Sequence, residues 1–359
     1  MKYSDNKLVK LETKLDNEER ISAAEALDLF ETKDILGLGY LADKLRQKRA
    51  GDAVTFVGNY HICYSNICVH HCRYCTFRRN QQDPDAFILD LPTIEKAAKE
   101  SKKSQCPEIL ILGGIHPGLD LEFALKVLKG IKRQVPQVKI LGFSPVEIDH
   151  FCRLENMEEE LVFSILKEAG LSAITGGGAE IFSPRIREQL GCTHKISGQR
   201  WLQIMEVAHR QGIFSNASLL YGVGETITER IEHLQAVREV QDRTGGFTHF
   251  LPFSCTLEHL PHTSGYDDIK MIAVSRIFLD NFKHIRAYWS HLGLPGAQLA
   301  LSFGADDLNG LRQKGRIIHS SGGGTLKITD KETMIGLIRD AGRIPVERDI
   351  LFNVIERYE

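Results

Sequence analysis

The chain has 359 residues, and its 45 lysines and arginines nearly balance its 47 aspartates and glutamates, giving a formal net charge of −2. This balance excludes the strongly basic surface that nucleic acids and anionic membranes select, so neither is expected as a partner. No apolar run reaches the roughly 18 residues of a membrane span, and residues 1–5 open no signal peptide. Three of the eight cysteines cluster in one short segment, which suits a reducing compartment, so we expect a cytoplasmic protein.

The first 52 residues are expected to form an N-terminal helical cap (residues 1–52) on the rest of the chain. Ser22 and Glu25 have the spacing of a capping box, and an apolar face follows over residues 26–30. A second helical pattern covers residues 35–48 and stops at Gly51.

Between residues 53 and 310, short apolar β-type segments alternate with longer amphipathic helical segments. Eight strands are expected, at residues 61–67, 108–112, 139–143, 172–175, 214–220, 248–253, 286–290 and 298–302. Strands separated by helices form a parallel sheet, which right-handed crossovers can close into a barrel. The predicted fold is therefore an α/β (β/α)8 TIM-type barrel, with an open doubly wound sheet as the alternative. Residues 311–359 are expected to add a C-terminal helical extension, with a helix start near Asp330.

Three cysteines, Cys68, Cys72 and Cys75, directly follow the first predicted strand in a C-x3-C-x2-C pattern. A loop this short can bring three thiolates to three corners of an iron–sulfur cube, but it cannot easily supply a fourth. Structural clusters usually have four cysteine ligands, so an iron left open indicates chemistry. A zinc knuckle or plain thiols are the alternatives, but zinc sites normally pair two knuckles and no second one follows. The neighbouring His70 and His71 are adjacent, so their side chains point apart.

This cysteine pattern, with the aromatic Tyr74 before the last cysteine, resembles the signature of radical S-adenosylmethionine (radical SAM) enzymes. The resemblance implies a barrel that holds a [4Fe-4S] cluster through Cys68, Cys72 and Cys75. It also implies that the open iron binds S-adenosyl-L-methionine, whose reductive cleavage releases a 5′-deoxyadenosyl radical. An electron donor such as flavodoxin or ferredoxin is implied as well, and Tyr74 is expected among the cofactor-binding residues.

Several residues at strand ends are expected to contact S-adenosylmethionine, because barrel enzymes carry their chemistry at the C-terminal ends of the strands. Gly113 and Gly114 follow the second strand and resemble the superfamily's glycine motif, which binds the methionine amino group. Ser144 offers a hydroxyl after the third strand. Glu180 follows the glycine run 176–178 and can accept hydrogen bonds from a ribose diol, with a solvated glutamate in a surface turn as the alternative.

Over roughly residues 20–355 the chain resembles one radical SAM subfamily. It contains aminofutalosine synthases, dehypoxanthine futalosine cyclases and the two halves of deazaflavin (FO) synthase. The segments most similar to aminofutalosine synthases are residues 147–151, 176–182, 194–197, 280–289 and 341–349. The resemblance implies a transferase that adds the deoxyadenosyl radical to 3-[(1-carboxyvinyl)oxy]benzoate and, after rearrangement and decarboxylation, yields 6-amino-6-deoxyfutalosine for menaquinone biosynthesis. A sister enzyme of the subfamily is the first alternative, and a non-catalytic zinc-binding barrel is the second.

The implied substrate has an aromatic ring and two carboxylates, which require cationic and hydrogen-bonding groups beside aromatic side chains. By position, the expected substrate-binding residues are Lys195, Asn216, His284, Arg286, Tyr288 and Asp306. Asp306 and its neighbour Asp307 could serve a metal or act as a base, or they could cap a helix.

Some segments depart from the subfamily pattern, all in loops expected to touch the substrate. Tyr60 and Cys63 replace a usual arginine and asparagine, and Thr175 stands where proline is usual. Residues 253–259 lack a usual Pro-Glu-Asn-Thr, and residues 308–311 lack an Asp-Gly-Thr. The resemblance therefore specifies the cofactors more firmly than it specifies the substrate. Cys63 is expected to be a strand thiol, and the other scattered cysteines to be small buried side chains, namely Cys106, Cys152, Cys192 and Cys255.

Overall fold

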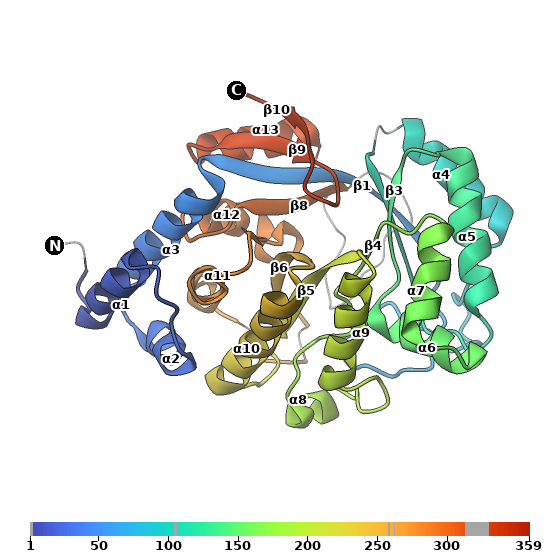
Figure 1. Ribbon diagram of the computed structural model, residues 1–359, viewed down its shortest axis with the longest axis horizontal. Coiled ribbons are helices and arrows are strands. Elements are labelled where there is room, and N and C mark those ends of the chain that lie inside the picture. The colour runs from blue at the N-terminus through green and yellow to red at the C-terminus, as the bar shows by residue number, and fades with distance from the viewer. Residues whose placement is uncertain (1–2, 104–105, 258, 262, 313–329) are drawn as a thin grey trace.

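The computed structural model describes residues 3–103, 106–257, 259–261, 263–312 and 330–359. At its centre is a parallel sheet whose first seven strands are hydrogen-bonded in chain order (Figure 1). Their bounds are Ala53–Ser65 (β1), Glu108–Gly113 (β2), Lys139–Gly142 (β3), Ala173–Ile174 (β4), Phe214–Tyr221 (β5), Phe247–Ser254 (β6) and His284–Ile285 (β7).

Strand β8, Asp307–Arg312, closes this sheet into a ring. It pairs in parallel with β1, and a parallel bridge between Arg286 and Asp307 joins it to the end of β7. The backbone N–H of Ala287 donates to the carbonyl of Asp307 at 2.8 Å across this junction. The predicted eight-stranded barrel is therefore confirmed.

The prediction of a last strand at residues 298–302 is wrong. Helix α12, Trp289–Ala300, occupies most of this segment and is interrupted at Gly293, where φ is 70°. A short buried apolar segment has no periodicity that separates a helix from a strand, which explains the error. The expected seventh strand at 286–290 is also wrong in position, because β7 is His284–Ile285 and Tyr288 is already the N-cap residue of α12.

The helices between the strands form an outer layer around the barrel (Figure 1). Besides α12 they are Leu91–Lys103 (α4), Leu121–Gln134 (α5), Pro145–Glu155 (α6), Glu159–Glu168 (α7), Pro184–Gln189 (α8), Gly198–Arg210 (α9), Ile227–Thr244 (α10) and Gly265–Phe278 (α11). Capping boxes at Ser144, Thr226 and Ser264 start α6, α10 and α11. None of the helices in the described part of the chain has the length and apolarity needed to cross a bilayer.

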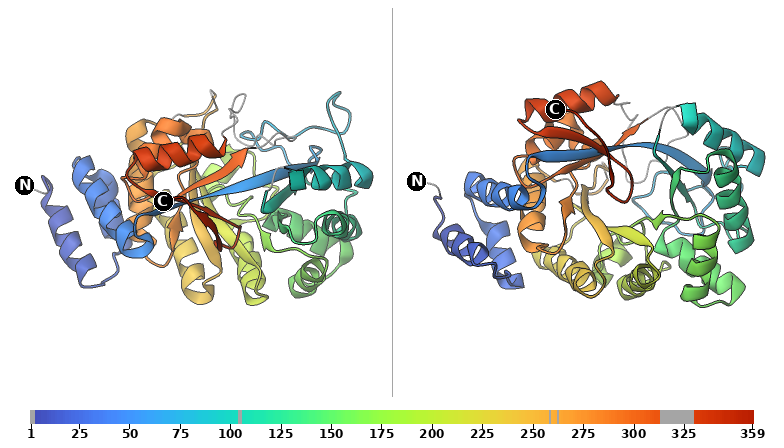
Figure 2. Two further views of the ribbon diagram at one scale, coloured as in Figure 1. Left: turned by 90° about the horizontal axis from the view of Figure 1, so that it is seen from above. Right: turned by 45° about the horizontal axis from the view of Figure 1, so that its top comes forward.

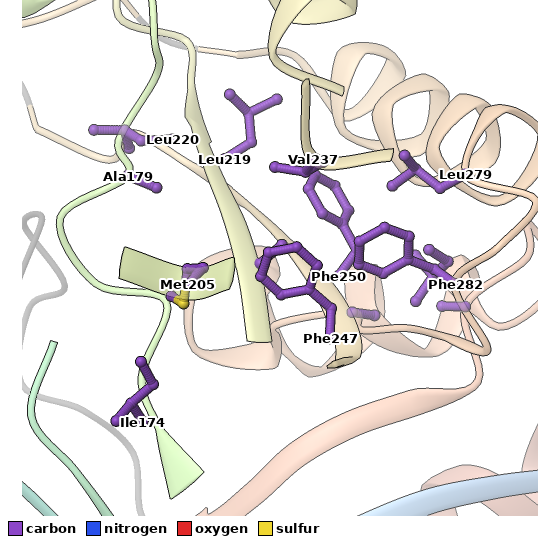
Figure 3. Close-up of a cluster of buried hydrophobic side chains, with 14 of the residues drawn as sticks. Ile174, Ala179, Met205, Leu219, Leu220, Val237, Phe247, Phe250, Leu279 and Phe282 are labelled. Carbon is purple, nitrogen blue, oxygen red and sulfur yellow. The ribbon is translucent and has the colours of Figure 1, made fainter. Parts of the chain in front are cut away.

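The outer faces of the strands pack against these helices through apolar side chains. Figure 3 shows one such cluster, which includes Met205 of α9, Phe247 and Phe250 of β6, and Phe282. The ring centroids of Phe247 and Phe250 lie 5.6 Å and 6.0 Å from that of Phe282. Burying each side chain of this size contributes about 1.5–3 kcal/mol to stability. Because this apolar layer lies outside the sheet, the barrel interior remains available to polar residues.

The N-terminal helices lie against the outer side of the barrel. They are α1 (Asn6–Asp16), α2 (Ala23–Glu31) and α3 (Ile35–Ala50), and α2 begins with the predicted capping box. Helix α3 packs against α11, and α2 packs against α10 and α11, so they cover its flank rather than its mouth (Figure 2). Arg20 forms ion pairs with Asp242 at 2.8 Å and Asp280 at 2.7 Å. The helices are confirmed, and their separation as a domain of residues 1–52 stays a prediction.

The C-terminal segment contains two strands as well as the expected helix. Helix α13, Lys331–Asp340, starts after Asp330, whose carboxylate accepts the Thr333 N–H at 2.8 Å. Strand β9, Ile344–Arg348, pairs in parallel with the start of β1, and β10, Val354–Arg357, pairs antiparallel with β9. The extension is thus only partly helical, and the domain limits 53–310 and 311–359 stay predictions.

The turn between β9 and β10 packs under the N-terminal end of the barrel. The ring of Phe352 stacks on His284, the first residue of β7, with centroids 4.1 Å apart. The guanidinium carbon of Arg348 lies 3.8 Å from the centroid of the same ring. The C-terminal segment therefore covers the end of the barrel opposite the cysteine loop.

Candidate active site

A cavity of about 320 Å3 occupies the interior of the barrel. Strand alternation determines its walls: Leu110 and Leu112 of β2 line it, whereas Ile109 and Ile111 between them are buried in the outer core. On β6 the same alternation brings three residues to the cavity wall, namely His249, Leu251 and Phe253. The cavity reaches from the cysteine loop after β1 to Ile350 of the C-terminal segment.

The three cysteines line the mouth of this cavity on the loop that follows β1. Backbone hydrogen bonds hold the loop, because the Cys68 N–H donates to Arg79 O at 3.1 Å and the Val69 N–H donates to Ile115 O at 3.0 Å. Ile115 follows β2, so the loop is fixed to the neighbouring strand. None of the cysteines in the described residues forms a disulfide, and three free thiols face the cavity: Cys68, Cys72 and Cys75.

The spacing of these sulfurs argues against zinc. Zinc binds thiolates at about 2.3 Å in a tetrahedron, which sets the sulfurs about 3.8 Å apart. Within the described residues, a compact set of three His, Cys, Asp or Glu ligand atoms, all within 4.8 Å of one another, occurs only at Glu158, Glu159 and Glu160. The three cysteine sulfurs form no such set, so they do not all lie within 4.8 Å of one another.

Gly113 and Gly114 let the end of β2 approach the cysteine loop. A Cβ on Gly114 would lie 2.2 Å from the carbonyl oxygen of Ile67, and one on Gly113 would lie 2.2 Å from the ring of Tyr64. The Gly114 N–H donates to Ser65 O at 2.8 Å. A side chain at Gly114 would push β2 away from the loop, and one at Gly113 would collide with the Tyr64 ring of β1, so each close approach requires glycine.

Glu180 is buried in a charged cluster beside the cysteines. Its carboxylate lies 2.7 Å from Lys195 Nζ and 3.3 Å from Arg187 Nη1, and it accepts a hydrogen bond from the Tyr74 hydroxyl. Burial raises the pKa of Glu180, but Lys195 and Arg187 outweigh this effect, so the pKa lies below its ordinary value. With only 4% of its surface exposed, Glu180 is not the solvated glutamate of the alternative interpretation.

Ser144 is the N-cap residue of α6, and its hydroxyl is already engaged there. It donates to Glu147 Oε2 at 2.8 Å, while the Tyr64 hydroxyl donates to Glu147 Oε1 at 2.5 Å. Burial raises the pKa of Glu147 to about 7, against the lowering effect of these hydrogen bonds. Ser144 and Glu147 both line the cavity. If Ser144 contacts the cofactor as predicted, it uses a hydroxyl that also caps α6.

The structure gathers most of the residues selected from the sequence at this one cavity. Besides the cysteines, the lining includes Tyr74, Gly113, Gly114, Ser144, Glu180, Lys195, Asn216, Arg286 and Tyr288. Asn216 has a backbone role as well, because its Oδ1 accepts the Gly176 N–H at 3.0 Å. Of the expected substrate-binding residues, His284 and Asp306 do not line the cavity.

His284 and Asp306 form a buried polar group at the N-terminal end of the barrel. Asp306 accepts from Arg276 at 2.6 Å and lies 2.8 Å from His284 Nδ1. Its neighbour Asp307 accepts from Arg286 and, at 2.7 Å, from Arg348. Neither aspartate caps a helix, and both carboxylates are bound by cations. The sequence analysis placed Asp306 at the active end because it put the eighth strand before this residue instead of after it.

Two family models match the chain. The model of the radical SAM superfamily matches residues 62–237, and the model of the CofH/MqnC C-terminal region matches residues 253–358. The aminodeoxyfutalosine synthase of Thermus thermophilus is 35% identical to the chain, over 99% of this chain and 98% of that protein. The chain is a member of the radical SAM superfamily. It is an enzyme of the subfamily that the sequence analysis identified.

The chain is also similar to a second relative and to a solved structure. The 5-amino-6-(D-ribitylamino)uracil–L-tyrosine 4-hydroxyphenyl transferase of Methanothermobacter thermautotrophicus is 35% identical, over 94% of this chain and 95% of that protein. The crystal structure of the FeFe-hydrogenase maturase HydG from Carboxydothermus hydrogenoformans superposes with a TM-score of 0.75 at 18% identity. It covers 97% of this chain and 81% of that chain, which shows that the fold is shared.

Radical SAM enzymes use a [4Fe-4S] cluster and S-adenosylmethionine, and the residues present suit both. Among the described residues, the cysteines that line the cavity are the three of the motif, so the cavity supplies three thiolates and no fourth. Cys63 and Cys255 are buried away from it. Cys192 was expected to be a plain buried side chain, but a hydrogen bond with its thiol lowers the pKa of Cys72 to about 7, against burial.

Among the polar residues that face the cavity, the sequence analysis missed Asn59, Glu108 and His249. Strand alternation carried a signal for two of them, since Glu108 and His249 occupy the same face of their strands as the inward leucines. Arg187 was missed as well, and nothing in its surrounding sequence indicates that it reaches Glu180.

Proposed function

We propose that this enzyme is an aminofutalosine synthase of menaquinone biosynthesis. In the proposed reaction, the 5′-deoxyadenosyl radical adds to the vinyl carbon of 3-[(1-carboxyvinyl)oxy]benzoate. The adduct rearranges by attack on the aromatic ring and loses carbon dioxide, a proton and one electron, which leaves 6-amino-6-deoxyfutalosine. The electron used to cleave S-adenosylmethionine is thereby recovered, and methionine is the other product. Flavodoxin or ferredoxin stays the predicted electron donor.

The observation that carries the proposal is the change of polarity along the cavity. The thiols lie at its mouth, Leu110, Leu112 and Phe253 line its apolar wall, and the buried guanidinium of Arg286 lies deeper inside. An aromatic ring fits an apolar wall, and a carboxylate fits a guanidinium beyond it. A substrate bound this way would direct its enolpyruvyl group toward the mouth, where the adenosyl radical forms.

The residues beside the cysteines suit the adenosyl half of the reaction. We expect the backbone of Gly113 and Gly114 to bind the methionine amino group, and Glu180 to accept hydrogen bonds from the ribose. Glu180 Oε2 has Arg187 as its partner at 3.3 Å, and a carboxylate oxygen can accept a second hydrogen bond. The buried ion pair with Lys195 keeps Glu180 ionised for this task.

An anaerobic single-turnover assay on the reconstituted enzyme tests the proposal. It contains S-adenosylmethionine, a strong reductant and the benzoate, and the products are identified by mass. Formation of 6-amino-6-deoxyfutalosine without an equal amount of free 5′-deoxyadenosine is the expected result. Free 5′-deoxyadenosine beside unchanged benzoate would reject the synthase and retain the radical enzyme.

The second candidate is the deazaflavin-forming reaction, which joins tyrosine to 5-amino-6-(D-ribitylamino)uracil. It is favoured by the equal identity to the archaeal transferase. It is also favoured by the buried acceptor atoms Asn59 Oδ1 and His249 Nε2, which lack partners within the described residues and would suit the N–H groups of a uracil. The same assay with tyrosine and the diaminouracil in place of the benzoate decides between the two.

A further inference from the structure

The inner end of the cavity is formed by four buried polar side chains. They are Asn59 of β1, Glu108 of β2, His249 of β6 and Arg286, which follows β7; we call them the polar floor. Asn59 and Glu108 are register partners on adjacent strands. The floor lies on the far side of the inward leucines from the cysteines, because Glu108 begins the strand that ends at Gly113.

Glu108 is the unusual member of the polar floor. Only 1% of its surface is exposed, and its Oε2 has no hydrogen-bond partner among the described residues. No ion pair within the described part of the chain joins it to Arg286, although the two share the cavity wall. Buried polar atoms are rarely left without a partner, so an open carboxyl oxygen in a cavity indicates a ligand.

Arg286 is held from behind and faces the cavity. Its Nε donates to Asp307, which also accepts from Arg348 at 2.7 Å and from the Thr55 hydroxyl at 2.7 Å. With its Nε fixed in this way, the terminal nitrogens of the guanidinium are available to a bidentate acceptor. A carboxylate is the acceptor that matches this fork.

The charges around Glu108 decide its protonation when a carboxylate binds. The charged groups with the largest effect on it are Arg348, Arg286 and Asp307, which sum to one positive charge, and Asn59 gives it a hydrogen bond, so these groups balance an ionised Glu108. A bound carboxylate would then leave one uncompensated buried negative charge, which is costly. Burial raises the pKa of Glu108 to about 7, with the two arginines opposing it, so protonation near neutral pH is accessible.

His249 does not compete for this role, because it is neutral. Burial lowers its pKa well below the ordinary value. The Thr248 hydroxyl donates to Ser215 O at 3.0 Å, so its oxygen accepts the Nδ1–H of His249 at 2.9 Å. The Nε2 of His249 is therefore an acceptor, like Asn59 Oδ1, and both would repel a second anion. The floor thus accommodates one carboxylate and no more.

We propose that the polar floor binds the ring carboxylate of the substrate between the guanidinium of Arg286 and the protonated carboxyl group of Glu108. Both carboxylate oxygens accept from the terminal nitrogens of Arg286, and one of them also accepts from the Glu108 O–H, whose proton comes from solvent on binding. This inference rests on the proposed function and deepens it, because it names the group that recognises the aromatic acid. The second carboxylate, on the enolpyruvyl group, stays at the mouth.

The test measures the affinity of the reconstituted enzyme, with S-adenosylmethionine bound, for 3-methoxybenzoate as a function of pH. Because a proton is taken up with the ligand, the affinity should fall about tenfold per pH unit above about pH 7. Glu108→Gln carries the proton donor at every pH, so its affinity should match the low-pH value of the parent and change less than about twofold. Glu159→Gln is the control, since Glu159 is a buried glutamate that does not line the cavity, and it should keep the pH slope.

Calorimetry in buffers of different ionisation enthalpy provides a second measurement that needs no variant. We expect uptake of about one proton per 3-methoxybenzoate at about pH 8, and none for 3-methoxybenzamide, which should bind at least about tenfold more weakly at about pH 6. An unchanged pH slope in Glu108→Gln, or binding of the acid without proton uptake, overturns the inference. If the parent enzyme still forms 6-amino-6-deoxyfutalosine, either result rejects only this inference and the proposed function stands. If the parent enzyme does not form that product, the proposed function itself is rejected.

Discussion

Lys195 Nζ lies 2.7 Å from Glu180 Oε1 and 3.1 Å from the hydroxyl of Tyr74. This one ammonium group therefore connects the loop after α8, the glycine run after β4 and the cysteine loop. Glu180 has a φ of 44°, a conformation that costs a non-glycine residue energy and persists where surrounding contacts enforce it. The ion pair supplies such contacts beside the cluster-binding loop.

Replacing Lys195 by methionine should destabilise the protein by about 3 kcal/mol, because it removes one partner of a buried ion pair and leaves the Glu180 charge less compensated. Urea unfolding of the cluster-free chain measures this loss. The double variant Lys195→Met/Glu180→Gln should recover a large part of it. Lys126→Met is the control, since its pair with Glu122 is exposed on a helix surface and should cost less than about 1 kcal/mol. Equal losses for the two lysines would contradict a buried, structural pair.

Serine at Cys68, Cys72 or Cys75 should abolish cluster binding, because each removes one of the three thiolates at the cavity mouth. Iron and acid-labile sulfide content, with the absorbance near about 400 nm of a reconstituted cluster, reports the outcome. Cys63→Ala is the control, and it should retain the cluster because Cys63 does not line the cavity. Loss of the cluster in Cys63→Ala would show that a fourth thiolate participates.

Alanine at Gly114 should disturb the cysteine loop, because the new Cβ would lie 2.2 Å from the backbone oxygen of Ile67. Since backbone cannot move as freely as a side chain, we expect a loss of about 1–3 kcal/mol and incomplete cluster reconstitution. Gly118→Ala provides the comparison, because its Cβ would lie 3.4 Å from its nearest neighbour, the His116 ring. The Gly114 interpretation fails if both variants reconstitute equally.

The stability of the cluster-free chain should depend on the protonation of Glu147. Its pKa is raised to about 7 in the folded state, so the folded chain binds this proton more tightly than the unfolded chain. The contribution is present at low pH and is lost as the pH rises from about 4.5 through about 7, by up to about 3 kcal/mol. Burial lowers the pKa values of His209 and His233 to about 4 and about 3. These two histidines therefore make the free energy of unfolding rise with pH, opposite to Glu147. The effect of Glu147 is isolated by comparing the parent with a Glu147 variant.

Glu147→Gln should therefore unfold with a shallower loss of stability than the parent between about pH 5 and about pH 8. Urea unfolding at several pH values under reducing conditions measures the two slopes. Identical slopes would mean that Glu147 is ionised in the folded chain throughout this range.

The local elements of the chain were predictable because they depend on residues close together in sequence. The capping box at Ser22, the helix start at Asp330, and the strands that begin at Glu108 and Lys139 all follow from local patterns, and the structure confirms them. The last strand failed because its true position, Asp307–Arg312, begins with a charged residue that only barrel closure buries.

The sequence by itself determined the cysteine loop, the glycine pair and the barrel class, and through them the superfamily. Spacing within eight residues is enough to specify where three thiolates can meet. Tertiary structure decided which charged groups share the cavity. Glu108 and Arg286 come from strands far apart in the chain, and Asp307 binds Arg286 instead of substrate only because β8 closes beside β7. Such partnerships depend on the closure of the barrel, which brings distant residues within a few ångströms.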